Sequence, residues 1–501
     1  MGKLKKEIFD WVYLMGMIFL LLFASMWVVY YIVENYVDVD SIFGGNLDEK
    51  KVYVLNGDEK FIQNSVKNEY KVEIIDDKKL SKLNSKSVLV VFDKVLSKDE
   101  QFLIEKFVKN GGGVIFNYGN YKNTQFIKRI TNLNDMLILK DKNFYIQTPS
   151  LSPFKVPKQK LTHFYENSLF YYEDKNSILN FIKDYKSYGV MWSGNYGKGS
   201  WVYFSFPFYV LNENHLSKLF LSMIDFAYYG YKVVKYPYVD SAKMIFLAEY
   251  MNYKMDKTFI NLINKFNLKA TLFINPDIVN EKLNFNNIEI ASISSKNKWI
   301  LQKYTKEQIV GFSNENHKEN IDILYNKYGF KYMLGDKLKI YYDDFVELPN
   351  IGFNDLEFKI NLKQLKHQID FSMKYGFYSL IVHPYILGYT KNQKFLVEIL
   401  TYLKKYPLFT AKEIAQKYKD SSKISLTSTL TSSSLAIKII NNTLKEVNNF
   451  TFRIYSKFKF DKIESNFFNI KAKIIKRGKG YVDVRVENIS KNVEFYIRMK
   501  K

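Results

Sequence analysis

The sequence contains no cysteine among its 501 residues. This absence excludes disulfide bridges, a thiolate nucleophile and a zinc site with cysteine ligands. Histidine is also scarce, with five residues. Four of them lie far apart in the sequence and lack the i, i+4 spacing of a metal site. These four are His163, His215, His317 and His367. A zinc site built from these four is therefore not expected. The length favours two to four domains.

Arginine is rare, although the chain carries a formal net charge of +23. Nucleic-acid recognition favours the planar arginine fork, and the lysines here are scattered among Asp and Glu along the whole chain. A nucleic-acid partner is therefore disfavoured, and a general bias of composition explains much of the charge. Attraction to acidic lipid headgroups or to an anionic polymer remains open.

One hydrophobic run, Trp11 to Val33, contains no charged residue and has aromatic residues near both ends. A helix of this length can cross a hydrocarbon core of about 30 Å. The flanking charges are Lys3, Lys5 and Lys6 before the run and Glu34, Asp38 and Asp40 after it. By the positive-inside rule we expect an uncleaved single-pass anchor within residues 1–40, with a cytoplasmic N-terminus and a periplasmic or extracellular bulk.

After the anchor, residues 51–236 alternate between apolar strands and helices, which predicts an α/β domain with a doubly wound parallel sheet. The first strands are expected at 51–57, 70–76, 87–93 and 113–119. Between the last two, Ser97 and Glu100 have the spacing of a capping box, and glycines 111–113 follow the helix. These glycines are interpreted as a helix stop rather than a phosphate cradle, since no GxGxxG pattern is present.

The segments GGGVIFNYGN (111–120) and YGKGSWVYFSFP (196–207) resemble class I glutamine amidotransferase-like domains. The resemblance is one of fold and implies an amidotransferase-like domain over roughly residues 51–236. Active members of that family use a cysteine nucleophile, which this chain lacks. Amidotransferase chemistry is therefore excluded.

Residues 243–418 repeat β-α units and predict a distorted β/α barrel. Three segments in it resemble polysaccharide deacetylases of the carbohydrate esterase family 4 type: NLKATLFIN (267–275), EIASISSKNKW (289–299) and LIVHPY (380–385). Together with the preceding domain, the arrangement is similar to Pel-type exopolysaccharide deacetylases, with the anchor in place of their N-terminal hydrolase domain.

The resemblance implies a divalent metal held by an aspartate and two histidines, a second aspartate as base and a late histidine as acid. The histidine positions fall on Ile293 and Asn297, which are unsuited to zinc. The aspartates fall within residues 247–251, where only Glu249 is acidic, and the late histidine corresponds to His383. We therefore expect a dismantled metal centre without a cofactor, with Glu249 and His383 as vestigial catalytic candidates. Each has a structural alternative, as a residue at a loop mouth or at a strand end.

The C-terminal part divides into a Ser/Thr-rich linker (420–434) and a small β-sandwich (435–501), predicted from alternating apolar residues and Asn/Gly turns. Four of its aromatic residues could stack on sugars, and these are Phe450, Phe452, Tyr455 and Tyr481. Core packing is the favoured role for them.

Three functional hypotheses follow. The favoured one is a membrane-anchored deacetylase-like protein without catalysis, which binds or guides an exopolysaccharide or other envelope glycan, or scaffolds an export complex. The second is an active N-deacetylase with a rearranged zinc site, built from Glu249, His383 and Asp343 or Asp344. The third is an envelope structural or adhesion protein that makes its contacts through the C-terminal sandwich.

Overall fold

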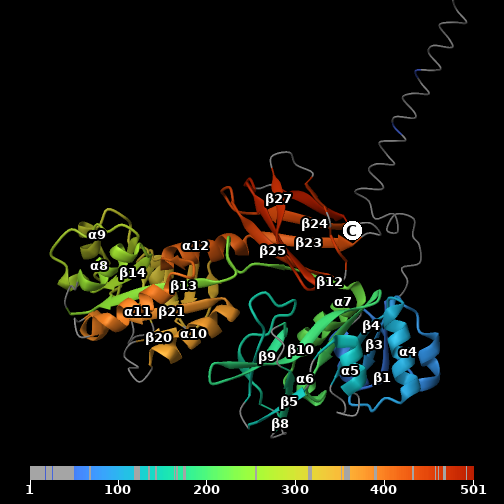
Figure 1. Cartoon of the computed structure of the whole chain (residues 1–501). Coiled ribbons are helices and arrows are strands. Elements are labelled where there is room, and N and C mark those ends of the chain that lie inside the picture. The colour runs from blue at the N-terminus through green and yellow to red at the C-terminus, as the bar shows by residue number, and fades with distance from the viewer. Residues whose placement is uncertain are drawn as a thin grey trace, which may run out of the picture.

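The structure of the whole chain is a computed structural model (Figure 1). It describes Met17, Ser25 and residues 50–500, except for 67–68, 118–123, 134–135, 142–143, 163, 165–167, 173–175, 254–256, 314–318, 351, 355–360, 389–391, 431–433, 457, 461, 466–469 and 492–493. The expected anchor at 11–33 lies outside the described residues, apart from Met17 and Ser25. Among the described residues, no helix is long and apolar enough to cross a membrane.

The first body is an α/β domain built on an 11-stranded sheet whose main path runs β2-β1-β3-β4-β11-β10-β9-β6-β7, while β5 and β8 pair beside it. Its first half is parallel, as expected. These five parallel strands are β2 (Lys71–Ile74), β1 (Lys51–Asn56), β3 (Ser87–Val91), β4 (Gly113–Asn117) and β11 (Gly199–Phe204). The others are β10 (Lys186–Tyr196), β9 (Leu179–Lys183), β6 (Tyr145–Gln147), β7 (Gln159–Lys160), β5 (Met136–Lys140) and β8 (Ser168–Tyr172).

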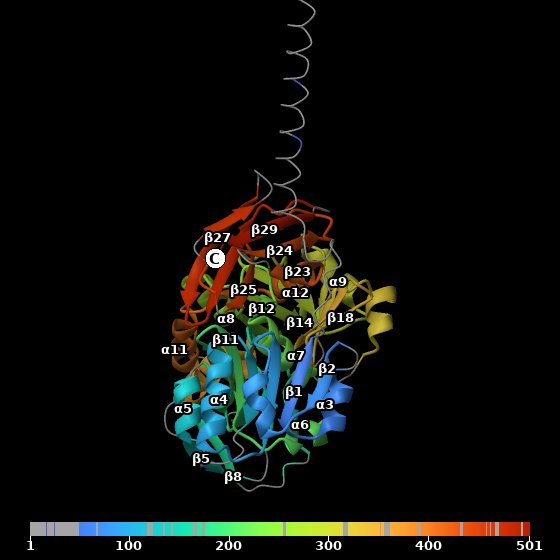
Figure 2. The same ribbon diagram turned by 90° about the vertical axis from the view of Figure 1, so that its right-hand side faces the viewer.

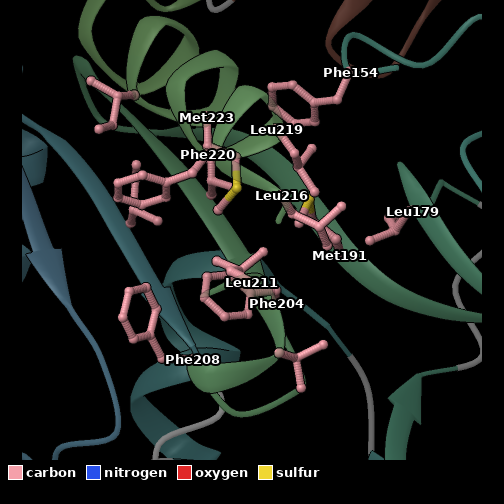
Figure 3. Packing of buried hydrophobic residues seen from close by; sticks show 14 of the residues in the cluster. Phe154, Leu179, Met191, Phe204, Phe208, Leu211, Leu216, Leu219, Phe220 and Met223 are labelled. Atoms are coloured by element: carbon pink, nitrogen blue, oxygen red, sulfur yellow. The ribbon is translucent and has the colours of Figure 1, made fainter. Parts of the chain in front are cut away.

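Helices cover both faces of this sheet, which makes it doubly wound. α3 (Glu59–Val66) and α7 (Ser217–Tyr229) bury residues in one core, whereas α4 (Lys98–Lys109) and α5 (Thr124–Thr131) bury residues in the other. Figure 3 shows the first core, where Leu219, Phe220 and Met223 of α7 pack over Phe204 and Met191 of the strands.

The glycine run at 111–113 ends α4, which confirms its interpretation as a helix stop. Ser97 and Glu100 form the expected capping box at the other end, with hydrogen bonds of 3.2 and 2.6 Å. Gly111 has φ +118°, a conformation that favours glycine. At Gly113 a Cβ atom would stand 2.2 Å from the carbonyl oxygen of Ala227, so glycine here allows α7 to pack directly on β4.

The second body is a curled sheet of ten strands in the order β18-β19-β17-β16-β15-β14-β13-β21-β20, with β22 beside β13. Among the described strands every pairing is parallel except β18 with β19. From β13 the order follows the chain through β14, β15, β16 and β17 to β19 on one side and runs through β21 to β20 on the other, so the sheet is an open barrel whose edge strands are β18 and β20. The strands are β13 (Met244–Met251), β14 (Ala270–Ile274), β15 (Ile288–Ser292), β16 (Gly311–Phe312), β17 (Tyr332–Gly335), β18 (Lys339–Tyr341), β19 (Phe345–Pro349), β20 (Gly352–Asn354), β21 (Phe377–Val382) and β22 (Leu408–Phe409).

Side chains alternate between the two faces of this sheet. The inner face forms a packed core around Phe246, Ala248, Tyr250 and Phe273, so the barrel is filled rather than hollow. The outer face packs beneath α8 (Lys257–Phe266), α10 (Leu362–Tyr375) and α11 (Gln393–Leu403). α12 (Ala411–Ser422) contributes Ala411, Ile414 and Ala415 to the inner core, and thereby closes the end where the strands begin.

The third body is a β-sandwich of two antiparallel four-stranded sheets, β12-β25-β28-β27 and β23-β24-β29-β26. It lies above the first body in the views of Figures 1 and 2, and the barrel lies to its left in Figure 1. Phe450 and Phe452 are buried in its core, which confirms the packing role expected for them. Its C-terminal strands are β24 (Ser434–Asn441), β25 (Phe450–Ser456), β26 (Lys462–Ser465), β27 (Lys471–Gly478), β28 (Tyr481–Glu487) and β29 (Glu494–Lys500).

Two segments of the sandwich lie outside the residues 435–501 expected to form it. β12 (Tyr231–Lys235), expected within the first domain, pairs with β25. β23 (Ile424–Leu430) occupies the segment expected as a linker and pairs with β24. Threonine and alternating apolar residues suit a half-buried edge strand, which is why a Ser/Thr-rich composition here forms a strand instead of a linker.

Candidate functional site

The carboxyl edge of the open barrel contains the residues that the sequence singled out. His383 directly follows β21 and is fully buried. Its ring stacks on Tyr250 of β13, and Tyr250 in turn stacks on Phe273 of β14, with centroid distances of 5.6 and 5.1 Å. The Tyr250 hydroxyl also hydrogen-bonds the Ser313 hydroxyl. His383 is therefore one layer of a ring stack that fills the end of the barrel.

The two positions expected for metal-binding histidines hold side chains that pack in the core or form a hydrogen bond within the protein. Ile293 packs against the inner core and offers no donor atom. The Asn297 side-chain amide donates to Asp277 over 3.1 Å. Among the described residues, no group of three or more His, Cys, Asp or Glu side chains is placed to hold a metal ion. These residues do not fit a divalent metal centre of the deacetylase type.

Glu249 and His383 are not brought together on one face of the sheet. Glu249 stands in register with Val382, and Val382 packs in the outer core beneath the helices. Because paired residues of parallel strands point to the same side, Glu249 faces the helix layer. His383, one residue beyond Val382, faces the inner side, where it meets Tyr250.

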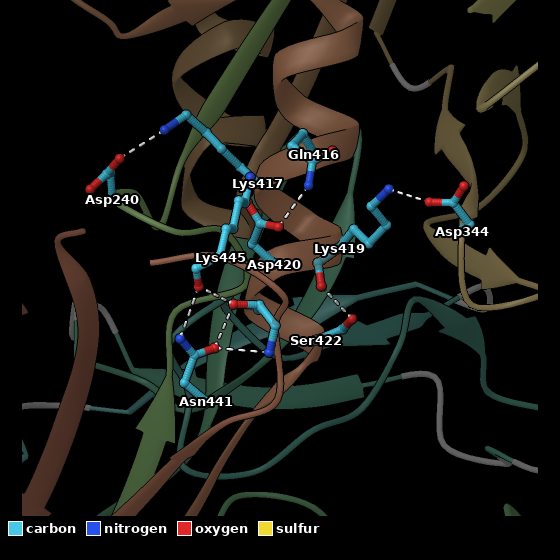
Figure 4. A network of polar contacts seen from close by, with 10 residues as sticks. Asp240, Asp344, Gln416, Lys417, Lys419, Asp420, Ser422, Asn441 and Lys445 are labelled. Carbon is cyan, nitrogen blue, oxygen red and sulfur yellow. Dashed lines mark hydrogen bonds and ion pairs between the residues drawn. The ribbon is translucent and has the colours of Figure 1, made fainter. Parts of the chain in front are cut away.

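The aspartates considered for a rearranged zinc site lie at the opposite end of the barrel. Asp343 and Asp344 precede β19, whose five residues span about 17 Å. Asp344 forms ion pairs with Lys331, over 2.6 Å, and with Lys419 of α12 (Figure 4). Burial alone would raise the pKa of Asp344, but these two lysines outweigh it and lower that pKa below its ordinary value. The ligand set of the active-esterase hypothesis is therefore dispersed.

A hydrogen-bonded polar row, which the sequence did not single out, crosses the carboxyl edge. The Asn275 side chain donates to the carbonyl of Asn252 and accepts from the amide of Asp277, both over 3.1 Å. Asp277 then accepts from Asn297, as described above. The row thus links the ends of β13, β14 and β15.

Exposed aromatic residues adjoin both ends of this row. Tyr253 follows Asn252 and is 84% exposed, and Trp299 lies two residues after Asn297 and is 57% exposed. Lys303 places its ammonium 4.3 Å from the centre of the Trp299 ring. The only sequence signal for this pair was their position just after strands of the barrel, since the sequence does not reveal which aromatics remain exposed.

The amino end of the barrel holds a second buried carboxylate, Glu289 of β15. It accepts hydrogen bonds from the Tyr332 hydroxyl (2.8 Å), the Thr271 hydroxyl (3.1 Å) and the backbone amide of Lys412 (2.9 Å). Burial raises the pKa of Glu289 to about 7, against the opposing effect of these donors. Because Lys412 lies in the first turn of α12, the carboxyl group fastens that helix to the barrel.

Comparison with known proteins finds no matching family model and no matching curated protein. Several solved structures are similar to part of the chain. A putative polysaccharide deacetylase from Mycobacterium smegmatis is 13% identical and covers 35% of this chain and 91% of its own, with a TM-score of 0.26. A probable polysaccharide deacetylase from Pseudomonas aeruginosa PAO1 is 12% identical and covers 36% and 91%, with a TM-score of 0.27. A family 4 carbohydrate esterase from Bacillus anthracis is 12% identical and covers 36% and 86%, with a TM-score of 0.24.

Proposed function

We propose that this chain is a membrane-anchored, extracytoplasmic protein that binds a glycan at the carboxyl edge of its deacetylase-like barrel without deacetylating it. One observation carries the proposal. The edge presents two exposed aromatic rings, Tyr253 and Trp299, adjoining a hydrogen-bonded row of amide and carboxylate side chains, while Ile293 and Asn297 stand where a metal would need ligands.

The chemistry of this edge suits a sugar chain. The C–H faces of a pyranose ring are apolar and are covered well by a flat aromatic ring, whereas its hydroxyl groups need partners that both donate and accept. Asparagine amides provide both functions from one side chain. In α/β folds with parallel strands, ligands bind outside the carboxyl ends of the strands, which is where these residues lie.

The wider setting belongs to the same proposal. The uncharged run from Trp11 to Val33 supports the anchor and the extracytoplasmic location, and the absence of cysteine supports a first domain without amidotransferase activity. We place the chain in an arrangement similar to Pel-type exopolysaccharide deacetylases, with an exopolysaccharide as ligand and proteins of its export machinery as partners. No resident cofactor is part of the proposal.

The test compares glycan binding and deacetylation by the full chain in mild detergent. We expect a hexamer of N-acetylglucosamine to bind without release of acetate, and we expect Tyr253→Ala with Trp299→Ala to weaken binding about tenfold or more. Phe102→Ala is the control, because Phe102 is 65% exposed on α4 of the first body. Unchanged affinity in the double variant, or acetate release that depends on His383, would overturn the proposal.

The envelope-adhesion hypothesis stays a prediction, and the structure changes how it should be tested. Deleting residues 425–501 would remove β25, the partner of β12 in the chain segment before the barrel. Loss of adhesion in that deletion could therefore arise from damage at the junction of the bodies. Substitutions on the exposed face of β27, such as Lys471→Ala, leave this pairing intact and make the cleaner test.

A further inference from the structure

A cavity of about 780 Å³ lies where the three bodies meet. The first body contributes the loop around Leu151 and part of β10, the barrel contributes Lys243 and Lys374, and the sandwich contributes residues of β25, β27 and β28. This volume falls within the range of about 300–1,000 Å³ that is typical of ligand sites.

Hydrogen bonds between the bodies hold the cavity walls together. The Tyr455 hydroxyl of the sandwich donates to the carbonyl of Leu151 over 2.6 Å. The Lys374 ammonium of the barrel donates to the Ser187 hydroxyl over 3.0 Å. The Asn180 amide donates to the Tyr375 hydroxyl over 3.2 Å. The cavity is thus part of the assembled fold and belongs to no single body.

The walls are strongly cationic. The described lining of the cavity contains no aspartate or glutamate. It contains six basic residues, which are Arg129, Lys243, Lys374, Arg453, Lys476 and Lys479. Both arginines are already neutralised by carboxylates outside the cavity. Arg453 pairs with Asp483 through bonds of 2.7 and 2.9 Å, and Arg129 lies 3.4 Å from Glu105.

Unlike the two arginines, the four lysines of the cavity lack a countercharge: among the described residues none of them forms an ion pair with a carboxylate. Lys374 is half-buried, and burial lowers its pKa below the ordinary value by making its charged form less favourable. A bound anion would supply the missing countercharge. The cavity therefore carries uncompensated positive charge from the barrel and from the sandwich.

Aromatic rings line the same cavity. Tyr455 of β25 and Tyr481 of β28 are half-buried rings in its wall, whereas Trp192 of β10 and Trp201 of β11 are only 2% and 5% exposed. Gly194 faces Trp201 across the strand pair, where a Cβ atom would stand 2.6 Å from the indole ring. The missing side chain lets the indole lie flat against the strand. Rings and ammonium groups together match a ligand that combines apolar faces with anionic groups.

We propose that this cavity binds an anionic segment of an oligosaccharide, in which the sugars carry carboxylate or phosphate groups. That the ligand is a carbohydrate rests on the proposed function, while its negative charge follows from the cavity alone. A nucleic acid is disfavoured, because the cations without a carboxylate partner are lysines rather than arginine forks. The cavity and the barrel edge are then two contact points for one acidic polymer.

The experiment titrates three probes into the full chain in mild detergent: hexagalacturonate, a neutral hexamer of N-acetylglucosamine and a 20-nucleotide oligothymidylate. We expect hexagalacturonate to bind, and Lys476→Glu with Lys479→Glu to weaken that binding at least about tenfold. Both lysines are exposed, so the variant is expected to fold. Lys374→Met should also weaken it. The control is Lys60→Glu with Lys78→Glu, which makes the same change of charge on the exposed surface of the first body.

The outcomes separate this inference from the proposed function. Failure of hexagalacturonate to bind, or equal weakening by both double variants, overturns the cavity as an anion site while neutral-glycan binding at Tyr253 and Trp299 stands. If Tyr253→Ala with Trp299→Ala leaves the binding of the neutral hexamer unchanged while the cavity variants still weaken the binding of hexagalacturonate, the proposed function is overturned and the cavity stands as an anion site. Tighter binding of oligothymidylate, with the same dependence on Lys476 and Lys479, overturns the carbohydrate assignment in favour of a nucleic acid.

Discussion

The imidazole ring of His383 lies against the phenol ring of Tyr250, with their centroids 5.6 Å apart and their planes 15° from parallel. This contact makes His383, the late histidine of the deacetylase-like pattern, part of the packed core. The residue is present at the expected strand end, but its ring face is covered by a core aromatic and no solvent reaches it. A histidine in this position stabilises the packing at the end of the barrel.

Zinc binding gives the first prediction. Among the described residues the carboxyl edge offers one buried histidine, and Glu249 faces the other side of the sheet, so fewer than three described ligands converge there. Calorimetric titration of zinc into the full chain should give no stoichiometric binding. Stoichiometric micromolar binding that disappears in Glu249→Ala or His383→Ala would contradict this and revive the esterase hypothesis.

The glycine run at the end of α4 gives the second prediction. Gly113→Ala should lower the free energy of unfolding of the first body by about 1–3 kcal/mol, because the new Cβ meets the backbone of α7 at Ala227. Gly111→Ala is a comparison in which backbone strain acts alone: its Cβ would have ordinary contacts of 4.0 Å, but its φ of +118° disfavours a side chain. Thermal unfolding of each variant is measured against the unsubstituted chain. A melting temperature of Gly113→Ala equal to that of the unsubstituted chain would show that α7 does not pack directly on β4.

The buried ion pair of the sandwich gives the third prediction. Asp483 receives two hydrogen bonds from Arg453, and its side chain is 1% exposed. Asp483→Ala leaves a buried guanidinium without a partner and should cost about 3–5 kcal/mol. Glu487→Ala, on the same strand, removes a more exposed pair with Lys473 and should cost less than about 1 kcal/mol. Urea unfolding of both variants tests this, and similar losses would mean that the Arg453 pair is not buried.

Most of the α/β pattern could be predicted from the sequence, because buried parallel strands are continuous apolar runs and because caps mark helix ends. α10 shows such caps, since it begins after the cap Asn361 and ends at Gly376 with φ +101°. The sandwich boundary could not be predicted. Whether β12 belongs to the first body or to the sandwich depends on pairing with β25, more than two hundred residues later, and local composition carries no such information.

The candidate site was harder to predict for the same reason. The sequence located the strand ends with Ile293, Asn297 and His383, but the face on which Glu249 lies depends on strand register. A shift of one residue turns a side chain to the other face. The cavity lysines come from two bodies, the barrel and the sandwich, and share no sequence pattern. Their grouping exists only in the folded chain.

The last prediction concerns Glu289 and α12. Its pKa of about 7 in the folded chain is raised from an ordinary 4.5 because the group is buried. Below about pH 4.5 the carboxyl is protonated in both states, so the full stability is present. Between about pH 4.5 and 7 the unfolded chain releases this proton while the folded chain keeps it. Stability should therefore fall as the pH rises through that window, by about 3 kcal/mol, and stay level above it.

Glu289→Gln should remove this pH dependence. A glutamine can accept from the Lys412 amide and the Thr271 hydroxyl through its oxygen, and donate to the Tyr332 hydroxyl through its nitrogen. Hydrogen exchange of the α12 amides at pH 5 and pH 8, corrected for intrinsic rates, measures the local opening free energy. Glu307→Gln is the control, since Glu307 contacts Lys412 from the surface with its side chain 78% exposed. If wild type and Glu289→Gln respond equally to pH, the buried carboxyl does not titrate in this range, and another group must account for any change in the attachment of α12.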